Sequence, residues 1–174
     1  LFDYLKLQNI KYLDIGAHHP SSCSNTYLFY KFKNCTGVCI EADPTLFEYF
    51  KQKRKNDIVL NIGITSHNEE SLNFYILDEK GLNTFSRDEA IKNVNELGKK
   101  IEQVIKVPTK SINSILSEYF PDGVEFVSLD IEGLEMSVLK SLDFEKHRPQ
   151  VFCIETINNG INGFQKEDII IDYM

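Results

Sequence analysis

The sequence has little of what marks several common protein classes. Glycine and proline number only 9 and 5 among 174 residues, so long flexible linkers are not expected. The chain carries 26 acidic and 19 basic residues, a net charge of −7, so the basic surface typical of nucleic-acid-binding proteins is missing. No apolar run reaches the length of a membrane span, and no segment reads as a signal peptide.

The cysteines also lack a pattern. The chain has four, and no two of them have the CxxC spacing of a zinc site. A chain of this length can bury a core without disulfide cross-links. We therefore expect free thiols and a cytoplasmic protein.

The length suits one domain. Leu1 is not an initiator methionine, and a helical pattern runs up to Met174. We therefore expect residues 1–174 to be a single domain that has been cut at both ends from a longer chain.

What the chain does contain is a regular alternation of apolar and amphipathic segments. Buried strands are predicted at residues 11–17, 36–43, 57–65, 125–133 and 149–156, and helices at 24–32, 45–55, from about 111 and at 134–142. Residues 71–78 alternate like an antiparallel strand, and residues 88–104 read as a polar surface helix or a mobile excursion. This order predicts an α/β fold with a doubly wound, mostly parallel sheet.

Polar residues collect where the predicted strands end. The strand ends are Asp14–His18, Glu41–Asp43, Asn61–Gly63, Asp130–Gly133 and Glu155–Thr156. In such a sheet the carboxyl ends of the strands meet at one edge, where ligands bind. One acid there would most simply cap a helix, but several buried carboxylates need a partner. We therefore predict a ligand that carries hydroxyls, an ammonium group or a metal.

Two features of the strand ends narrow the choice of ligand. Glu41, at the end of the second strand, is placed to accept hydrogen bonds from both hydroxyls of a ribose. The first strand is followed by Gly16 alone and not by GxGxxG, which disfavours a pyrophosphate at this turn. S-adenosylmethionine has an adenosine without a pyrophosphate, and its cationic groups suit an acidic rim.

Five segments together resemble one protein family. In chain order they are DIGAHH, SNTYLFY, GVCIEADP, VSLDIEGLEMSVLKSL and VFCIE, and they extend from about Tyr12 to Glu155. This set resembles the FkbM-type S-adenosylmethionine-dependent methyltransferases. Ala42 stands where the family usually has a proline, and the His18-His19-Pro20 sequence resembles one subset of the family.

The resemblance implies a Rossmann-like class I methyltransferase fold whose C-terminal hairpin is missing after Met174. It implies a cofactor site made of Asp14, Gly16 and Ala17 at the methionine end, Glu41 at the ribose, and Ala42, Asp43 and Gly63 near the ribose and adenine. It also implies methylation of a hydroxyl oxygen on a small-molecule or glycan acceptor, often in glycan biosynthesis.

The acceptor chemistry suggests catalytic residues. A sugar hydroxyl is a very weak acid, so a magnesium or manganese ion that lowers its pKa would help. Asp130 and Glu155 are suitable oxygen ligands for such an ion. His18 and His19 can supply a third ligand or the general base, so the catalytic candidates are Asp130, His18 and His19. The alternative role for Asp130 and for Glu132 is to cap the helix that follows them.

Two other functions remain open at this point. An NAD-dependent sugar dehydrogenase or epimerase would need a catalytic tyrosine–lysine pair, and Tyr27 and Lys31 have the required spacing on a helix. A non-catalytic Rossmann-like scaffold would have lost its cofactor. The sequence leaves the oligomeric state open.

Overall fold

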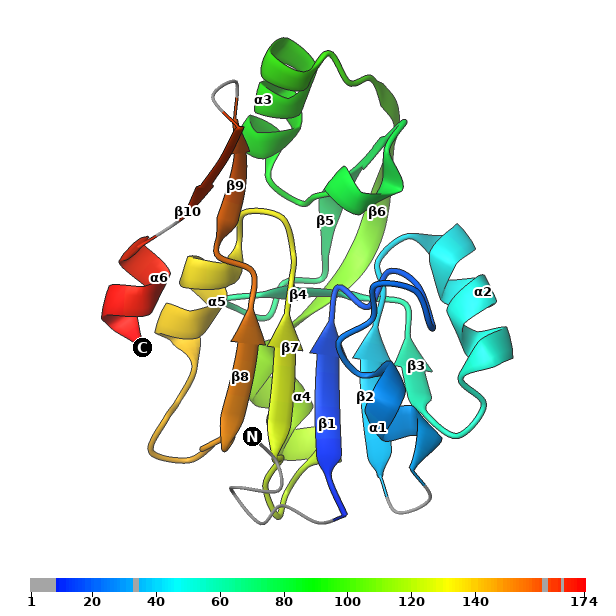
Figure 1. The fold of residues 1–174 in the computed structure, drawn as a ribbon, viewed down its shortest axis with the longest axis vertical. Coiled ribbons are helices and arrows are strands. Elements are labelled where there is room, and N and C mark those ends of the chain that lie inside the picture. Colours follow the sequence, from blue (N-terminus) through cyan, green and yellow to red (C-terminus); the bar gives the residue numbers. More distant parts are fainter. Residues whose placement is uncertain (1–8, 33–34, 161–162, 167) are drawn as a thin grey trace.

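The structure is a computed structural model that describes residues 9–32, 35–160, 163–166 and 168–174 (Figure 1). Its centre is a five-stranded sheet in which every neighbouring pair is parallel. The strands are β1 (Lys11–Ile15), β2 (Thr36–Ile40), β3 (Ile58–Leu60), β7 (Phe126–Leu129) and β8 (Val151–Ile154), in the order β3-β2-β1-β7-β8. The winding reverses beside β1, so the predicted α/β, Rossmann-like fold is confirmed.

Helices cover both faces of this sheet, which explains why its central strands are buried on both sides and mostly apolar. On one face, Leu13 of β1 packs in a cluster with Ile115 of α4 (Ile112–Tyr119) and Val138 of α5 (Glu135–Ser141). On the other face, Tyr12 packs with Phe29 of α1 (Tyr27–Lys31) and with residues of α2 (Pro44–Lys53). Figure 1 shows α1 in front of the sheet and α4 behind it.

The predicted third strand, residues 57–65, is wrong as a single element. It divides into β3 and β4 (Gly63–Thr65), and these two strands belong to different sheets. Between them, the side-chain amide of Asn61 donates hydrogen bonds to the backbone oxygens of Glu41 (2.8 Å) and Ala42 (3.0 Å). Those bonds hold the chain at the end of β2 while it turns into the second sheet.

The second sheet has the order β4-β6-β5 and rises above the ends of the parallel strands (Figure 1). β5 (Ser71–Leu77) pairs antiparallel with β6 (Ile101–Ser111), as its alternation predicted. Between β5 and β6 lie a short 3-10 helix, η1 (Lys80–Leu82), and α3 (Arg87–Leu97). The predicted surface helix is therefore present but ends at Leu97, and residues 101–104 belong to β6.

The C-terminal part also differs from the expectation. No strand is predicted after residue 156, but β9 (Ile157–Gly160) and β10 (Gly163–Lys166) form an antiparallel hairpin before α6 (Asp168–Tyr173). This hairpin precedes Met174, so it does not bear on the expectation stated for the segment after that residue. Within the described residues this hairpin is a sheet of its own and does not extend the five-stranded sheet.

Across the described ranges, the helices are all too short or too polar to cross a membrane.

Candidate active site

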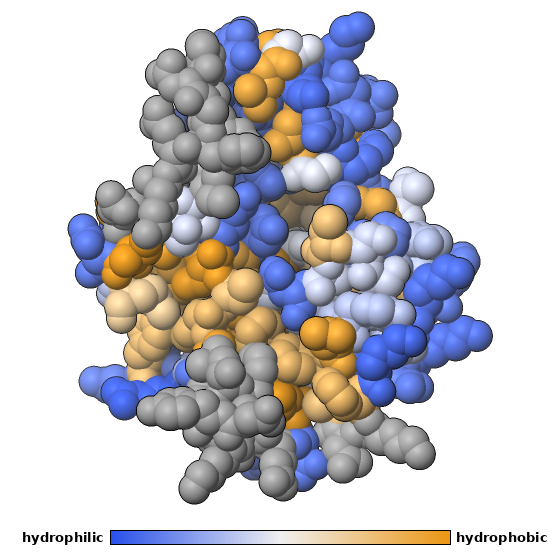
Figure 2. Space-filling model, in the orientation of Figure 1, coloured by the Kyte–Doolittle hydropathy of each residue, from blue (hydrophilic) through white to orange (hydrophobic). Residues whose placement is uncertain are grey.

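A cavity opens at the carboxyl ends of β1, β2 and β7. Its volume is about 920 Å³ including the open mouth, and the second sheet closes it from above. Figure 2 shows the hollow on this face, between the part that carries α3 and the part that carries β1 and α2. The cavity therefore lies where the winding of the sheet reverses, as predicted from the polar residues at the strand ends.

Most of the predicted site residues line this cavity. They are Asp14, Gly16, Ala17, His18, Glu41, Ala42, Gly63 and Asp130. Three predicted residues do not line it: His19, Asp43 and Glu155. The sequence missed several lining residues that come from other segments: Cys23, Ser24, Asn25, Phe74, Lys80, Asn83, Phe85 and Ser128.

Asp14 lies within β1, and its side chain is buried at the floor of the cavity. Thr26 donates a hydrogen bond of 2.5 Å to its carboxylate. Burial raises the pKa of Asp14 to about 6, although the Thr26 hydroxyl and the charge of Arg54 act in the opposite direction. A cationic group in the cavity would therefore stabilise the ionised form.

Gly16 allows the chain to leave β1 beside β7. It has a φ of +78°, and a Cβ there would lie 1.7 Å from the backbone oxygen of Asp130. The amides of Gly16 and Ala17 both donate to the backbone oxygen of Ile40, at 3.1 and 3.0 Å. Any side chain at position 16 would push β1 and β7 apart, so this position requires glycine.

Glu41 is buried at the end of β2, and the backbone engages both of its carboxylate oxygens. One accepts the amide of His18 at 2.7 Å, and the other accepts the amide of Asp43 at 2.8 Å. Burial raises the pKa of Glu41 to about 7, and these two amides limit the rise. Each oxygen keeps a further lone pair for a hydroxyl donor in the cavity.

Asp43 and His19 have local roles outside the cavity. Asp43 is the N-cap of α2, where its side chain accepts a hydrogen bond from the backbone amide of Thr45 at 2.8 Å. It also accepts a hydrogen bond from the side-chain amide of Asn83 at 3.1 Å. The His19 Nδ1 atom accepts the amides of Ser21 and Ser22 at 3.2 and 2.8 Å, so its ring closes a turn. We leave both residues out of the site that we propose below.

The upper wall of the cavity is apolar. A Cβ on Gly63 would lie 2.2 Å from the Phe85 ring, so glycine lets that ring pack against β4. Phe85 contacts Phe74 with ring centroids 4.7 Å apart. Ile62 lines the cavity with these rings, so its wall offers a flat, apolar surface.

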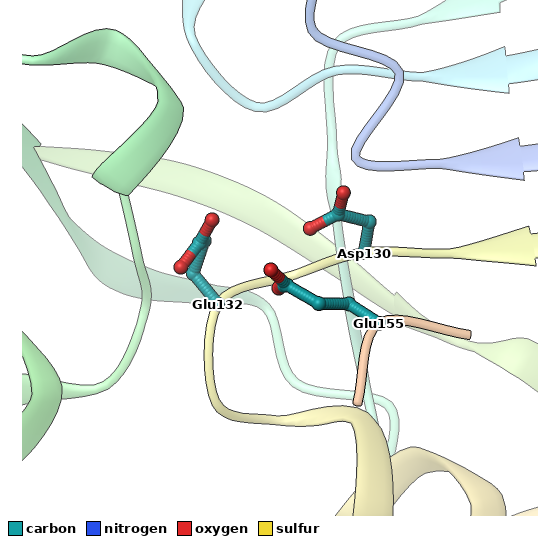
Figure 3. A group of neighbouring side chains, drawn as sticks. All are labelled: Asp130, Glu132 and Glu155. Atoms are coloured by element: carbon teal, nitrogen blue, oxygen red, sulfur yellow. The ribbon is translucent and has the colours of Figure 1, made fainter. Parts of the chain in front are cut away.

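Three carboxylates gather beside the cavity, at the ends of β7 and β8. Asp130 follows β7, Glu132 lies in the loop after it, and Glu155 follows β8; their side chains point toward one another (Figure 3). One oxygen from each lies within 4.8 Å of the others. Glu132 does not cap α5, since that helix has no side-chain cap.

The crowding of these acids changes their protonation. Burial is the main cause that raises the pKa of Glu155 to about 9, and the charge of Asp130 is the second. The same two causes raise the pKa of Glu132 to about 8. Burial also raises the pKa of Asp130, although hydrogen bonding with Glu155 acts to lower it. At neutral pH the cluster therefore retains protons unless a cation joins it.

A fourth acid fixes the loop that carries this cluster. Glu135, in the first turn of α5, accepts the amides of Ile131 at 2.7 Å and Gly133 at 3.0 Å. Glu132 has a φ of +53°, which is rare for a residue with a side chain. The two hydrogen bonds from these backbone amides hold the loop in this conformation and direct Glu132 toward Asp130.

Arg54 supports the cavity from behind, although it lies among basic residues at the end of a helix. Its side chain is completely buried. It donates to the backbone oxygen of Pro20 (2.6 Å), to Ser24 (2.8 Å) and to Thr26 (3.2 Å), and it pairs with Asp57 (3.2 Å). Arg54 thus positions the loop that contributes Ser24 and Asn25 to the cavity.

Comparison with known proteins agrees with this geometry. No curated protein and no solved structure matches the chain. The model of the methyltransferase FkbM domain matches residues 14–174, which include the carboxyl ends of β1, β2 and β7 around the cavity. The chain therefore belongs to the FkbM methyltransferase family, a family of S-adenosylmethionine-type methyltransferases.

Proposed function

We propose that this methyltransferase transfers a methyl group from S-adenosylmethionine to a hydroxyl oxygen of a sugar or glycan precursor. The observation that carries the proposal is the position of the carboxylates Asp130, Glu132 and Glu155 at the rim of a cavity suited to an adenosine. The four cysteines are free, so we place the reaction in a reducing compartment such as the cytoplasm.

The residues present fit S-adenosylmethionine. The wall formed by Ile62, Phe74 and Phe85 suits an adenine ring. Glu41 has free lone pairs for the two ribose hydroxyls. Asp14, at the floor, is a carboxylate suited to the cationic methionine end. When bound, S-adenosylmethionine supplies an electrophilic methyl group on its sulfonium.

The groups that would handle the acceptor proton are Asp130 and His18. Both line the cavity, and the charge of His18 acts to lower the pKa of Asp130. Either residue would accept the proton that the acceptor hydroxyl loses when it is methylated. Glu155 lies beside Asp130, and one oxygen of each carboxylate lies within 4.8 Å of the other.

We further propose that the carboxylate cluster holds a magnesium or manganese ion. Asp130, Glu132 and Glu155 each offer one oxygen within a span of 4.8 Å, and oxygen ligands are those that these ions prefer. A cation there would relieve the repulsion among the acids and lower the pKa of an acceptor hydroxyl.

The substrate class can be tested directly. The protein is incubated with S-adenosylmethionine that carries a labelled methyl group and with a panel of free sugars, nucleotide-linked sugars and oligosaccharides. We expect the label in a methyl ether of one of these compounds. Transfer only to amines or thiols would contradict the proposed oxygen acceptor, whereas the methyltransferase assignment would stand.

Glu41→Ala is expected to weaken the binding of S-adenosylmethionine by about 1.5–3 kcal/mol, the range for hydrogen bonds to a charged group. Isothermal titration calorimetry measures this as a rise of roughly 10- to 150-fold in the dissociation constant. Because Glu41 also holds the backbone at His18 and Asp43, part of the effect can come from the loop.

His19→Ala controls for that contribution. This substitution removes two hydrogen bonds with backbone amides of the same loop, but His19 does not line the cavity. The affinity for S-adenosylmethionine should therefore stay near that of the wild type. Equal losses in both variants would mean that Glu41 acts only through the loop. Unchanged affinity in Glu41→Ala would refute the ribose site.

Removal of metal with excess EDTA is expected to abolish turnover, and added magnesium or manganese should restore it. Binding is read independently by electron paramagnetic resonance during a manganese titration of the free protein. The bound signal should disappear in Asp130→Asn. Full activity in excess chelator would show that no metal is needed and would leave the proton transfer to Asp130 or His18 alone.

The sugar dehydrogenase or epimerase alternative finds no support at this cavity. Its tyrosine and lysine would be Tyr27 and Lys31, but neither residue lines the cavity. The Lys31 ammonium instead lies over the Tyr27 ring at 5.2 Å, and that ring also packs against Arg54.

A further inference from the structure

We propose that two copies of this chain pair through the edges of their β6 strands, antiparallel and centred on Val104. β6 is the middle strand of its sheet only at one end. Among the described residues, β4 pairs with it at Thr109–Ser111, so the stretch from Ile101 to Val107 is paired on one side only, with β5. This part of the strand stands above the five-stranded sheet (Figure 1).

The direction of the unpaired backbone groups follows from β5. Tyr75 donates its amide to Thr84 at 2.8 Å and accepts the Thr84 amide at 3.2 Å, so both of its backbone groups point away from β6. Val104 lies directly opposite Tyr75. In an antiparallel pair the two facing residues behave alike, so the amide and carbonyl of Val104 point away from β5, toward the open edge.

The edge is also open to solvent. Val104 is 47% exposed, although it is a large apolar residue in a strand. Glu102, Gln103 and Lys106 are exposed as well. Pro108 has no amide hydrogen, and by the same alternation its nitrogen faces the open edge, so it ends the stretch that can pair. An unpaired edge of this kind is a template for another strand.

The side chains identify a second copy as the partner. A two-fold axis at Val104 places the two Val104 residues opposite each other and places Glu102 of each copy opposite Lys106 of the other. The edge is thus complementary to itself in charge, as an isologous interface requires. The register between β5 and β6 shifts at Leu77, which pairs with Ile101, so Glu102 has no partner residue on β5. Glu102 therefore contributes to the proposed interface through its charge. Glu102 also lies 3.5 Å from Lys80 of its own chain, in a pair exposed to solvent.

The association is measured by sedimentation velocity of the wild-type chain over a wide range of concentrations. We expect a reversible monomer–dimer equilibrium. Val104→Pro should raise the dimer dissociation constant about thirtyfold, which corresponds to roughly 2 kcal/mol for the two hydrogen bonds lost across the axis. The fold should survive, since this amide makes no bond to β5, and circular dichroism checks that point.

Charge reversal gives a test that a merely destabilised fold cannot imitate. Glu102→Lys and Lys106→Glu should each weaken the dimer, because like charges then meet twice across the axis. A mixture of these two variants should form a heterodimer, because every facing pair is again of opposite sign. Glu48→Lys, an exposed change of the same charge on α2, should leave the equilibrium unchanged.

Three results would overturn the proposal. They are a wild-type chain that stays monomeric at every concentration, a dimer that Val104→Pro does not weaken, and a mixture of the two charge variants that does not associate. In the first case Lys106 and Pro108 would serve to keep this edge unpaired.

Discussion

Asp130→Asn is expected to lower the rate of methyl transfer by about 10²- to 10⁴-fold, the range for loss of a general acid–base group. The affinity for S-adenosylmethionine should change little, because the methionine and ribose contacts that we propose come from Asp14 and Glu41. Asparagine keeps the shape of the side chain but cannot take up a proton or balance a cation. The Asp130 backbone amide, which donates to Ile15 at 3.0 Å, is unaffected.

The fold is not expected to suffer from this substitution. Burial and neighbouring carboxyl groups raise the pKa values of Glu132 and Glu155, so removal of the Asp130 charge relieves repulsion in the cluster. The melting temperature of Asp130→Asn should therefore equal or exceed that of the wild type. Turnover is read as S-adenosylhomocysteine formed with a methylated sugar acceptor, and cofactor affinity is read by calorimetry.

Glu132→Gln separates the two roles proposed for the cluster. If Asp130 acts alone as the proton acceptor, Glu132→Gln should retain most of the turnover. If a metal is held by all three acids, Glu132→Gln should also lose turnover and should require more added metal. Wild-type turnover in Asp130→Asn would refute both roles.

The sequence predicted the part of the site that lies on the parallel sheet. A polar residue at the end of an apolar strand has a fixed position in this fold, since parallel strands end at one edge. Asp14, Glu41 and Asp130 could therefore be assigned to the cavity before the structure was known. The family resemblance then indicated which cofactor such a cavity holds.

The upper wall could not be predicted in the same way. Phe74 and Phe85 belong to the second sheet and the segment after it, and their contact with Gly63 is a long-range packing detail. The alternation in residues 71–78 indicated a strand but not the face that meets a ligand. Residues 57–65 were also predicted as one strand. Nothing in the local sequence shows that the Asn61 side chain forms hydrogen bonds with Glu41 and Ala42 that redirect the chain.

Arg54 shows most clearly where sequence patterns fail. It lies in a run with Lys51, Lys53 and Lys55, and a basic last turn normally interacts with water and the helix dipole. The structure separates these residues completely. The three lysines are exposed, whereas the Arg54 side chain is buried among Tyr27, Tyr30 and Phe50. Charge composition cannot distinguish a solvated base from a buried one, since only the tertiary position decides.

We expect Arg54→Ala to lower the free energy of unfolding by about 3–5 kcal/mol, the cost of removing one partner of a buried ion pair. Its partner Asp57 has a side chain that is only 1% exposed and would be left without the guanidinium. The hydroxyls of Ser24 and Thr26 and the backbone oxygen of Pro20 would each lose a donor as well. Because Thr26 in turn binds Asp14, the cavity floor should loosen and S-adenosylmethionine should bind more weakly.

Lys53→Ala provides the matched control from the same basic run. Lys53 is exposed, and its ammonium lies 5.7 Å from the centre of the Tyr49 ring, so its loss should change stability by no more than about 0.5 kcal/mol. Urea unfolding of both variants gives the comparison. Arg54→Ala combined with Asp57→Asn should lose less than the sum of the two single changes, because the uncompensated charge is then absent. Equal stability of Arg54→Ala and Lys53→Ala would mean that the buried guanidinium contributes nothing to the fold.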